Sequence, residues 1–134
     1  DSLQAAILLS KIGIFSDEIN KRQQVAKRYF DLLTNNTEIY TQCVPEDMTS
    51  AWAQYSILAL DREHRQAVQD NLKAQNIPSV IYYPKPLHIQ NAFSYLGYEG
   101  GEIPVSEDCA NRIFSLPMHP YLSYEEQFKI VKAI

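Results

Sequence analysis

Apolar residues in the first quarter of the chain recur at the spacing of an α-helix. The stripe that begins at Leu3 predicts a helix over residues 2–12, and we expect it to end at Gly13, a residue favoured just past helix ends. Ser16 then offers an N-cap with two acidic residues in the first turn, where carboxylates meet the positive end of the helix dipole. A second apolar stripe predicts that this helix continues to about Asn35.

The middle of the chain has the pattern of strand, helix and strand. Residues 39–44 are bounded by Asn and Pro, which indicates a short extended segment. Residues 52–60 are apolar or aromatic on both faces, which predicts a central strand buried in a sheet. Asp61 can cap a helix that ends near Asn76, and residues 79–83 predict a second strand. We therefore expect a split βαβ-like unit with a helix on one face.

The last third of the chain alternates short helices with loops. Residues 89–96 predict one or two helical turns, and a glycine-rich stretch follows them. A further helix is expected from Ser106 through Phe114, then a proline-stiffened connector, then a last helix that begins with the capping box of Ser123 and Glu126. Together these elements predict an α+β fold, with helices packed on a small, mostly antiparallel sheet of three or so strands.

Length and charge limit what such a fold can do. The chain has 134 residues and a mass of 15.4 kDa, which is enough for one domain with a single core. Twelve Lys and Arg against 16 Asp and Glu leave a net charge of −4, which argues against a nucleic-acid partner. The most apolar run, Ala5 to Ser10, is interrupted at Lys11, so we expect no membrane-spanning segment.

The cysteine and histidine pattern indicates neither a disulfide framework nor a metal. The two cysteines, Cys43 and Cys109, stand alone, and no pair of histidines or carboxylates has metal-ligand spacing. We therefore expect reduced cysteines, a cytoplasmic protein and no metal site. The chain also opens and stops inside apolar-periodic stretches, which suggests a piece of a longer protein.

The densest cluster of polar and aromatic side chains lies at Tyr82–His88, where a predicted strand meets a loop stiffened by two prolines. Phenols at Tyr82 and Tyr83 can donate hydrogen bonds to sugar hydroxyls or phosphate oxygens. Lys85 offers a point charge for an anion, and His88 can donate or accept near neutral pH. Together they predict a site for a polar, anionic small molecule.

A structural interpretation of the same cluster stays open. In that case one tyrosine belongs to the core, Lys85 is solvated and His88 caps a turn. Elsewhere no serine has the context of a nucleophile elbow, and no lysine lies in an apolar setting that suits covalent catalysis. The residues therefore predict no self-sufficient active site, with no catalytic and no cofactor-binding residue in this chain.

Several segments, in order, resemble the DegT/DnrJ/EryC1/StrS family of sugar-nucleotide aminotransferases from end to end. The helix that opens the chain resembles the family's LDxLQAAIL helix, and two later segments resemble its HYPxPLH and LPMHPxL motifs. The matching segments are Asp1–Leu8, the spacing of Arg22, Ala26, Tyr29 and Leu32, Trp52–Tyr55, Tyr82–His88, Gly97-Tyr98 and Leu116–Leu122.

The resemblance implies the C-terminal small domain of a fold type I enzyme that uses pyridoxal 5'-phosphate (PLP). Residues 1–36 would be bridging helices and residues 37–134 the sheet with its helices. In the family a large N-terminal domain carries the lysine that holds PLP. The intact enzyme is expected to be a homodimer that moves an amino group, from L-glutamate, to a nucleotide-linked keto-sugar in surface polysaccharide or glycoconjugate synthesis.

By the same resemblance Tyr82, Tyr83, Lys85 and His88 would contact the nucleotide sugar. Position 82 is often His in relatives and is Tyr here. Two alternatives stay open: a sugar dehydratase of the same family that uses the aminated cofactor (PMP), and a non-catalytic binding module. Apolar surface over residues 3–10 and on the sheet face should be exposed without a large domain, so pairs of copies are also expected.

Overall fold

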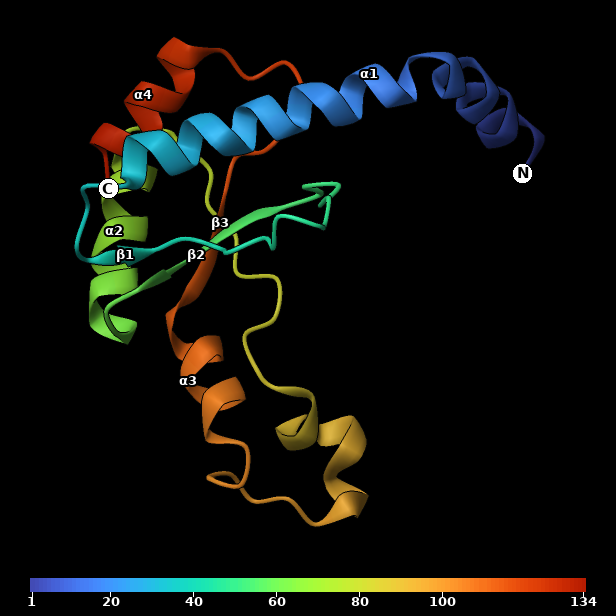
Figure 1. Ribbon diagram of the computed structural model, residues 1–134. Helices are drawn as coiled ribbons and strands as arrows, with labels where there is room; N and C mark the ends of the chain where they lie inside the picture. The colour runs from blue at the N-terminus through green and yellow to red at the C-terminus, as the bar shows by residue number, and fades with distance from the viewer.

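A computed structural model describes residues 1–134 as helices packed around one small sheet, with a separate group of short helices at one end (Figure 1). In chain order the elements are α1 (Ser2–Leu33), β1 (Ile39–Tyr40), β2 (Tyr55–Ala59), α2 (Arg62–Ala74), the 3₁₀ helices η1 (Leu87–Ile89) and η2 (Asn91–Leu96), α3 (Pro104–Arg112), β3 (Ile113–Leu116) and α4 (Tyr124–Lys132).

The sheet has three antiparallel strands in the order β1-β2-β3, which confirms the predicted α+β fold. The central strand is β2, inside the range 52–60 where the sequence predicts it. Its side chains are buried on both faces, and the hydroxyls of Ser56 and Ser115 pair across β2 and β3 at 2.8 Å. A polar pair can lie in this core because each hydroxyl satisfies the other.

The third strand is not the one that the sequence predicts. Residues 79–83 contribute only one antiparallel bridge, from Val80 to Ser115, while β3 takes the place assigned to the end of a helix. Pro78 and Pro84 flank the predicted strand and cannot donate to a ladder, which limits its pairing. Segment 79–83 and β2 each lie antiparallel to β3, on its two sides, so they run parallel to each other with α2 between them in the chain. The expected split βαβ-like unit is therefore present, with a single bridge in place of its second strand.

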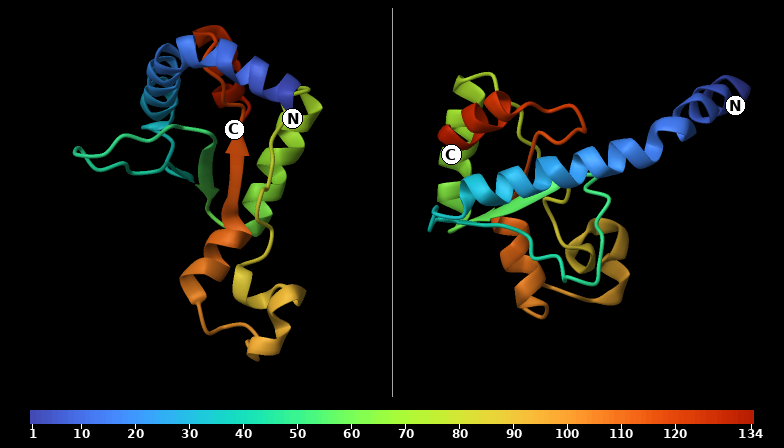
Figure 2. Two further views of the ribbon diagram at one scale, coloured as in Figure 1. Left: turned by 90° about the vertical axis from the view of Figure 1, so that its right-hand side faces the viewer. Right: turned by 45° about the horizontal axis from the view of Figure 1, so that its top comes forward.

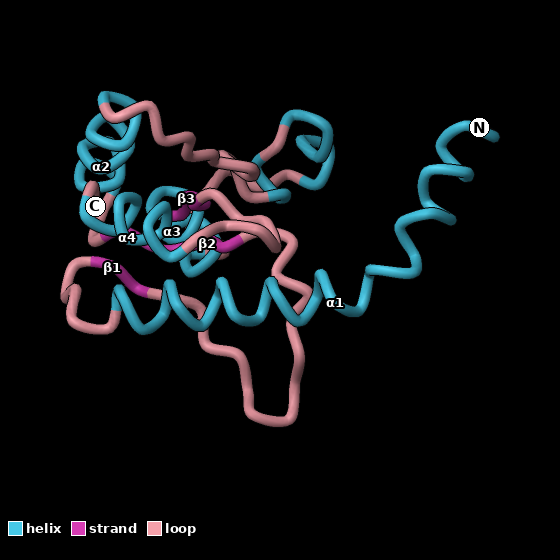
Figure 3. Tube along the Cα trace, turned by 90° about the horizontal axis from the view of Figure 1, so that it is seen from above, coloured by secondary structure: helices cyan, strands magenta, loops and turns pink.

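Helix α1 runs unbroken through the predicted stop at Gly13. Ending the helix there would leave carbonyls without partners, whereas an exposed helical glycine costs only about 1 kcal/mol. The first turns run at an angle to the rest and extend alone from the molecule (Figures 2 and 3). Their apolar side chains are exposed, as the sequence predicts, with Leu3 71% and Leu9 72% accessible.

The core lies between the second half of α1, the sheet, α2 and α4. It contains 17 buried apolar residues, with contributions from all of these elements. Tyr29 of α1 stacks on Tyr55 of β2 with ring centroids 4.8 Å apart, and its hydroxyl donates to the carbonyl of Pro117 at 2.9 Å. Helix α4 begins with the predicted capping box of Ser123 and Glu126.

Residues 84–112, which we call the lower lobe, extend from one end of the sheet and contain η1, η2 and α3 (Figure 1). The helical turns predicted over 89–96 are confirmed. Helix α3 starts at Pro104, two residues before the predicted start, because proline suits the first turn of a helix. No helix in the structure combines the length and the apolar character needed to cross a bilayer.

Candidate functional site

The Tyr82–His88 segment leaves the sheet edge and enters the lower lobe. Its last contact with the sheet is the bridge at Val80, and Pro84 and Pro86 then hold the backbone extended. Tyr83 is 71% accessible and Lys85 is exposed, whereas Pro86 is buried. The segment therefore presents polar side chains to solvent on a stiff support.

Tyr82 is half accessible and lies beside strand β3. Its side chain helps to line a hollow of about 130 Å³ whose other walls include Gln54, Ser115 and Met118. The hollow is small, but it places a phenol next to backbone at the end of the sheet. A hydroxyl in this position can donate to an oxygen of a ligand that lies across the sheet edge.

His88 turns away from solvent into the lower lobe. It is 8% accessible, and its Nε2 lies 3.0 Å from Oε1 of Glu107 in α3. The ring of Tyr98 meets it edge-on, with centroids 5.6 Å apart and planes at 80°. His88 is thus packed and paired inside the chain, unlike the three residues before it that the sequence groups with it.

Glu107 accepts hydrogen bonds from the glycine-rich loop as well as from His88. The Gly101 amide donates to its two oxygens at 2.8 and 2.9 Å, and the Ile103 amide donates at 3.3 Å. The amide of Gly101, followed by His88, lowers the pKa of this carboxyl below its ordinary value. Glu107 therefore stays ionised at neutral pH and accepts from every donor around it.

The structure brings together part of the predicted cluster. Tyr82, Tyr83 and Lys85 face solvent on one loop, while His88 faces the lobe interior. Their role as substrate contacts stays a prediction. The sequence pattern does not single out Glu107, which lies at the start of the helix predicted from Ser106. The sequence does place Glu107 six residues after Gly101. A flexible glycine loop can turn back so that its backbone amides donate to a carboxylate at this spacing.

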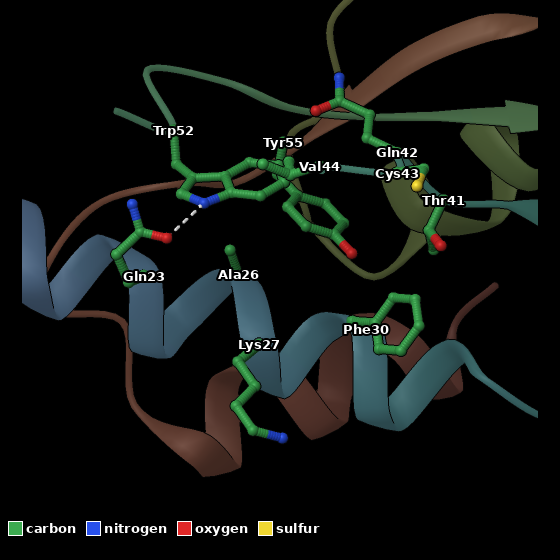
Figure 4. A pocket seen from close by; sticks show the side chains of 10 residues that line it. All are labelled: Gln23, Ala26, Lys27, Phe30, Thr41, Gln42, Cys43, Val44, Trp52 and Tyr55. Carbon is green, nitrogen blue, oxygen red and sulfur yellow. Dashed lines mark hydrogen bonds between the residues drawn. The ribbon is translucent and has the colours of Figure 1, made fainter. Parts of the chain in front are cut away.

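A larger hollow of about 540 Å³ lies on the other side of the sheet, above α1 (Figure 4). The rings of Trp52 and Tyr55 form its roof, and the indole N–H donates to Gln23 at 2.9 Å. Its one charged side chain, Lys27, pairs with Asp31 at 2.8 Å. This hollow is lined mainly by apolar side chains and has few groups that could take part in a reaction.

The residues of the chain do not fit a PLP site. Six of its seven lysines are exposed, and the seventh, Lys21, pairs with Asp17 on the surface of α1. Lys27 and Lys73 line surface hollows beside Asp31 and Asp70, but no lysine of the chain is buried. No group of three metal-ligating side chains is present either.

Comparison with known proteins finds a family model and relatives that match this chain. The model of the DegT/DnrJ/EryC1/StrS aminotransferase family matches residues 1–134. A UDP-2-acetamido-2-deoxy-3-oxo-D-glucuronate aminotransferase of Pseudomonas aeruginosa is 42% identical over 91% of the chain and 32% of its own length. A dTDP-3-amino-3,6-dideoxy-alpha-D-galactopyranose transaminase of Aneurinibacillus thermoaerophilus is 34% identical over the whole chain and 35% of its own.

Solved structures agree with these sequence matches. A DegT DnrJ EryC1 StrS aminotransferase from Brucella abortus has a TM-score of 0.87 and 45% identity over 99% of the chain and 34% of its own. DesV of S. venezuelae, 24% identical, shares the fold with a TM-score of 0.89 over 97% of the chain and 34% of its own. The chain spans about a third of the length of the relatives it matches.

Proposed function

Because the chain belongs to the DegT/DnrJ/EryC1/StrS aminotransferase family, we propose that it forms the C-terminal part of a PLP-dependent sugar aminotransferase. The complete protein transfers an amino group from an amino acid, L-glutamate, to the ketone of a nucleotide-linked sugar. The observation that carries this proposal is the family match over every residue of the chain. The names of the two relatives, one a UDP-sugar enzyme and one a dTDP-sugar enzyme, support the substrate class.

The cofactor is proposed to lie outside these residues. The scattered, exposed lysines of the chain supply no covalent anchor for PLP, so the anchoring lysine belongs to the remaining two thirds of the protein. PLP supplies the electron sink for moving the amino group, and the protein supplies binding and orientation. In this arrangement residues 1–36 connect the two parts of the protein, and residues 37–134 form its small domain.

The chain's own contribution is to hold the nucleotide sugar. Lys85 is exposed and positive, which suits the diphosphate of the substrate. Tyr82 and Tyr83 carry exposed hydroxyls for sugar or phosphate oxygens. Because Pro84 and Pro86 restrict the backbone between them, little conformational entropy is lost when the substrate binds.

We further propose a cytoplasmic homodimer that serves polysaccharide or glycoconjugate synthesis. Both cysteines are free thiols, which suits a reducing compartment. The exposed apolar side chains on the first turns of α1 suit a contact with the rest of the enzyme or with a second copy.

The test is an assay of the complete reading frame that contains this chain. The purified protein is mixed with L-glutamate and a UDP- or dTDP-linked keto-sugar, and amino-sugar and 2-oxoglutarate are measured by mass spectrometry. We expect the two products in equal amounts. Lys85→Ala should raise KM for the nucleotide sugar about tenfold, the value of one charge-assisted hydrogen bond, with Lys73→Ala on the exposed face of α2 as the matched control.

Three outcomes separate the proposal from its rivals. A sugar that loses a hydroxyl and gains no nitrogen would identify a dehydratase. Tight binding of the nucleotide sugar without turnover would identify a binding module. Amination of a keto-sugar with unchanged KM in Lys85→Ala would keep the reaction and reject this loop as the substrate contact.

A further inference from the structure

One side chain, Glu107, joins three segments of the lower lobe. Its carboxylate lies on the first turns of α3 and accepts from His88 at the end of the site loop, and from Gly101 and Ile103 in the loop before α3. We propose that Glu107 is a positioning residue for the nucleotide-sugar site, which acts through His88 to hold the loop that carries Tyr82 and Lys85. This inference rests on the proposed function.

The contacts around the carboxylate assign a proton to His88. An ionised carboxylate only accepts hydrogen bonds, so the proton in the 3.0 Å contact lies on Nε2 of His88. The other ring nitrogen, Nδ1, has no hydrogen-bond partner within the chain. Glu107 thereby fixes both the orientation and the tautomer of the imidazole, as second partners of functional histidines do.

Apolar burial cannot replace this contact. No side chain of residues 89–112 is buried, and two of the largest, Tyr95 and Val105, are 78% and 76% accessible. Gly101 has a φ of +87° and Gly100 a φ of +107°, so this loop has backbone freedom that other residues lack. Beside the buried Pro86 and His88, the hydrogen bonds to Glu107 therefore supply specific constraints on where the loops lie.

The constraint reaches the site through a short, stiff segment. His88 follows Lys85 by three residues, and the buried Pro86 lies between them. Gln90 also donates to the carbonyl of Lys85 at 3.2 Å, which ties the two ends of this turn together. With His88 fixed to α3, the backbone at Lys85 has few alternative positions, and loss of Glu107 frees it.

A neighbouring glutamate provides a matched control. Glu102 lies in the same loop and accepts from the amides of Glu99 and Gly100 at 3.1 and 3.3 Å, but it does not contact His88. A variant at Glu102 loosens the loop without releasing the histidine. Comparison of the two glutamates therefore separates positioning of the site from general stability of the lobe.

The experiment compares Glu107→Ala, Glu107→Gln and Glu102→Ala in the complete protein by hydrogen exchange and by kinetics. For Glu107→Ala we expect exchange over residues 84–90 and 97–103 to rise about tenfold, as loss of a charge-assisted hydrogen bond implies. KM for the nucleotide sugar should rise by a similar factor. Release of 2-oxoglutarate from glutamate alone should stay unchanged, because that half of the reaction does not use the sugar.

Glu107→Gln keeps an acceptor for the Gly101 amide, so most of the hydrogen-exchange protection of residues 97–103 should return. This variant also keeps the inference testable if Glu107→Ala fails to fold. Glu102→Ala should raise exchange only near residues 99–100 and leave KM unchanged. Unaltered exchange over 84–90 in Glu107→Ala, or an equal rise in KM in Glu102→Ala, overturns the inference. Absence of glutamate turnover in the unmodified protein rejects the proposed function instead, and the exchange data then still decide the role of Glu107.

Discussion

The sheet region and the lower lobe are held together by different interactions. Around the sheet, 17 apolar residues from helices, strands and the loops next to them bury one another. In the lobe, a single carboxylate gathers three donors and the large side chains remain exposed. Burial stabilises without regard to direction, whereas hydrogen bonds fix particular atoms in place. The region that carries the candidate site is therefore expected to have the lower free energy of local unfolding.

The largest expected effect comes from emptying the core. Phe114 on β3 is 1% accessible, and Phe114→Ala should lower the free energy of unfolding by about 3–5 kcal/mol because a cavity replaces the ring. Tyr95→Ala in the lower lobe removes an aromatic ring that is 78% accessible and should change it by less than about 0.5 kcal/mol. Urea unfolding followed by the fluorescence of Trp52 measures both. Equal losses in the two variants would contradict the contrast between the regions.

A smaller loss is expected at the one buried amide that links α1 to α4. Gln127 is fully buried, donates to the carbonyl of Val25 at 2.9 Å and accepts from Nε of Arg28 at 2.5 Å. Gln127→Leu leaves Nε of Arg28 without its partner and removes a second donor from the Val25 carbonyl, which keeps its bond within α1, and should cost about 1–3 kcal/mol in the same unfolding assay. Gln66→Leu on the exposed face of α2 is the control, and its cost should be near zero.

Acid should loosen the lower lobe before the sheet region. The pKa of Glu107 lies below its ordinary value of 4.5, chiefly because Gly101 and His88 donate to the ionised form. The resulting stabilisation is complete above pH 4.5 and is lost as the pH falls through the lowered pKa.

Hydrogen exchange, corrected for the intrinsic effect of pH, tests this order. Glu126 in the capping box of α4 also has a lowered pKa, because Ser123 donates to it from the backbone and the side chain. Helix α4 keeps the buried Ile130 when Glu126 is protonated, and so should stay protected longer than residues 97–103. Glu107→Gln should remove the acid dependence of the lobe. Simultaneous loss of protection in both regions would show that the lobe is not separately held.

The smallest effect is expected at the residue next to Glu107. Asp108 pairs with Arg112 one turn later at 3.2 Å, but its side chain is 57% accessible. Asp108→Asn should therefore change the free energy of unfolding by less than about 0.5 kcal/mol and leave exchange over 84–90 unaltered. A larger change would mean that charge on α3, and not the particular contacts of Glu107, holds the lobe.

The sequence predicts the features that depend on neighbours along the chain. Asp61 caps α2 and Ser123 caps α4 as expected, since a cap needs only a side chain and an amide two or three residues away. Strand β3 needs a partner nearly 60 residues earlier, and Phe114 suits the end of a helix as well as a strand. The break expected at Gly13 fails because the helix propensity of its neighbours outweighs one glycine.

The candidate site shows the same limit. The proline-flanked loop and its exposed Tyr83 and Lys85 follow from the local sequence. The inward turn of His88 does not, because its partner Glu107 lies 19 residues further along the chain. The residue types predict which side chains could bind a ligand. The packing of distant segments decides which of these side chains remain accessible to it.

Helix α1 is anchored at one end only. Its second half is packed around Tyr29, while the side chains of the first turns are exposed. With 32 residues, the helix measures about 48 Å along its axis, and about 40 Å of it lies before Tyr29. Because residues 1–36 are proposed to connect the two parts of the protein, this length lets the apolar first turns meet the remaining part well away from the core described here.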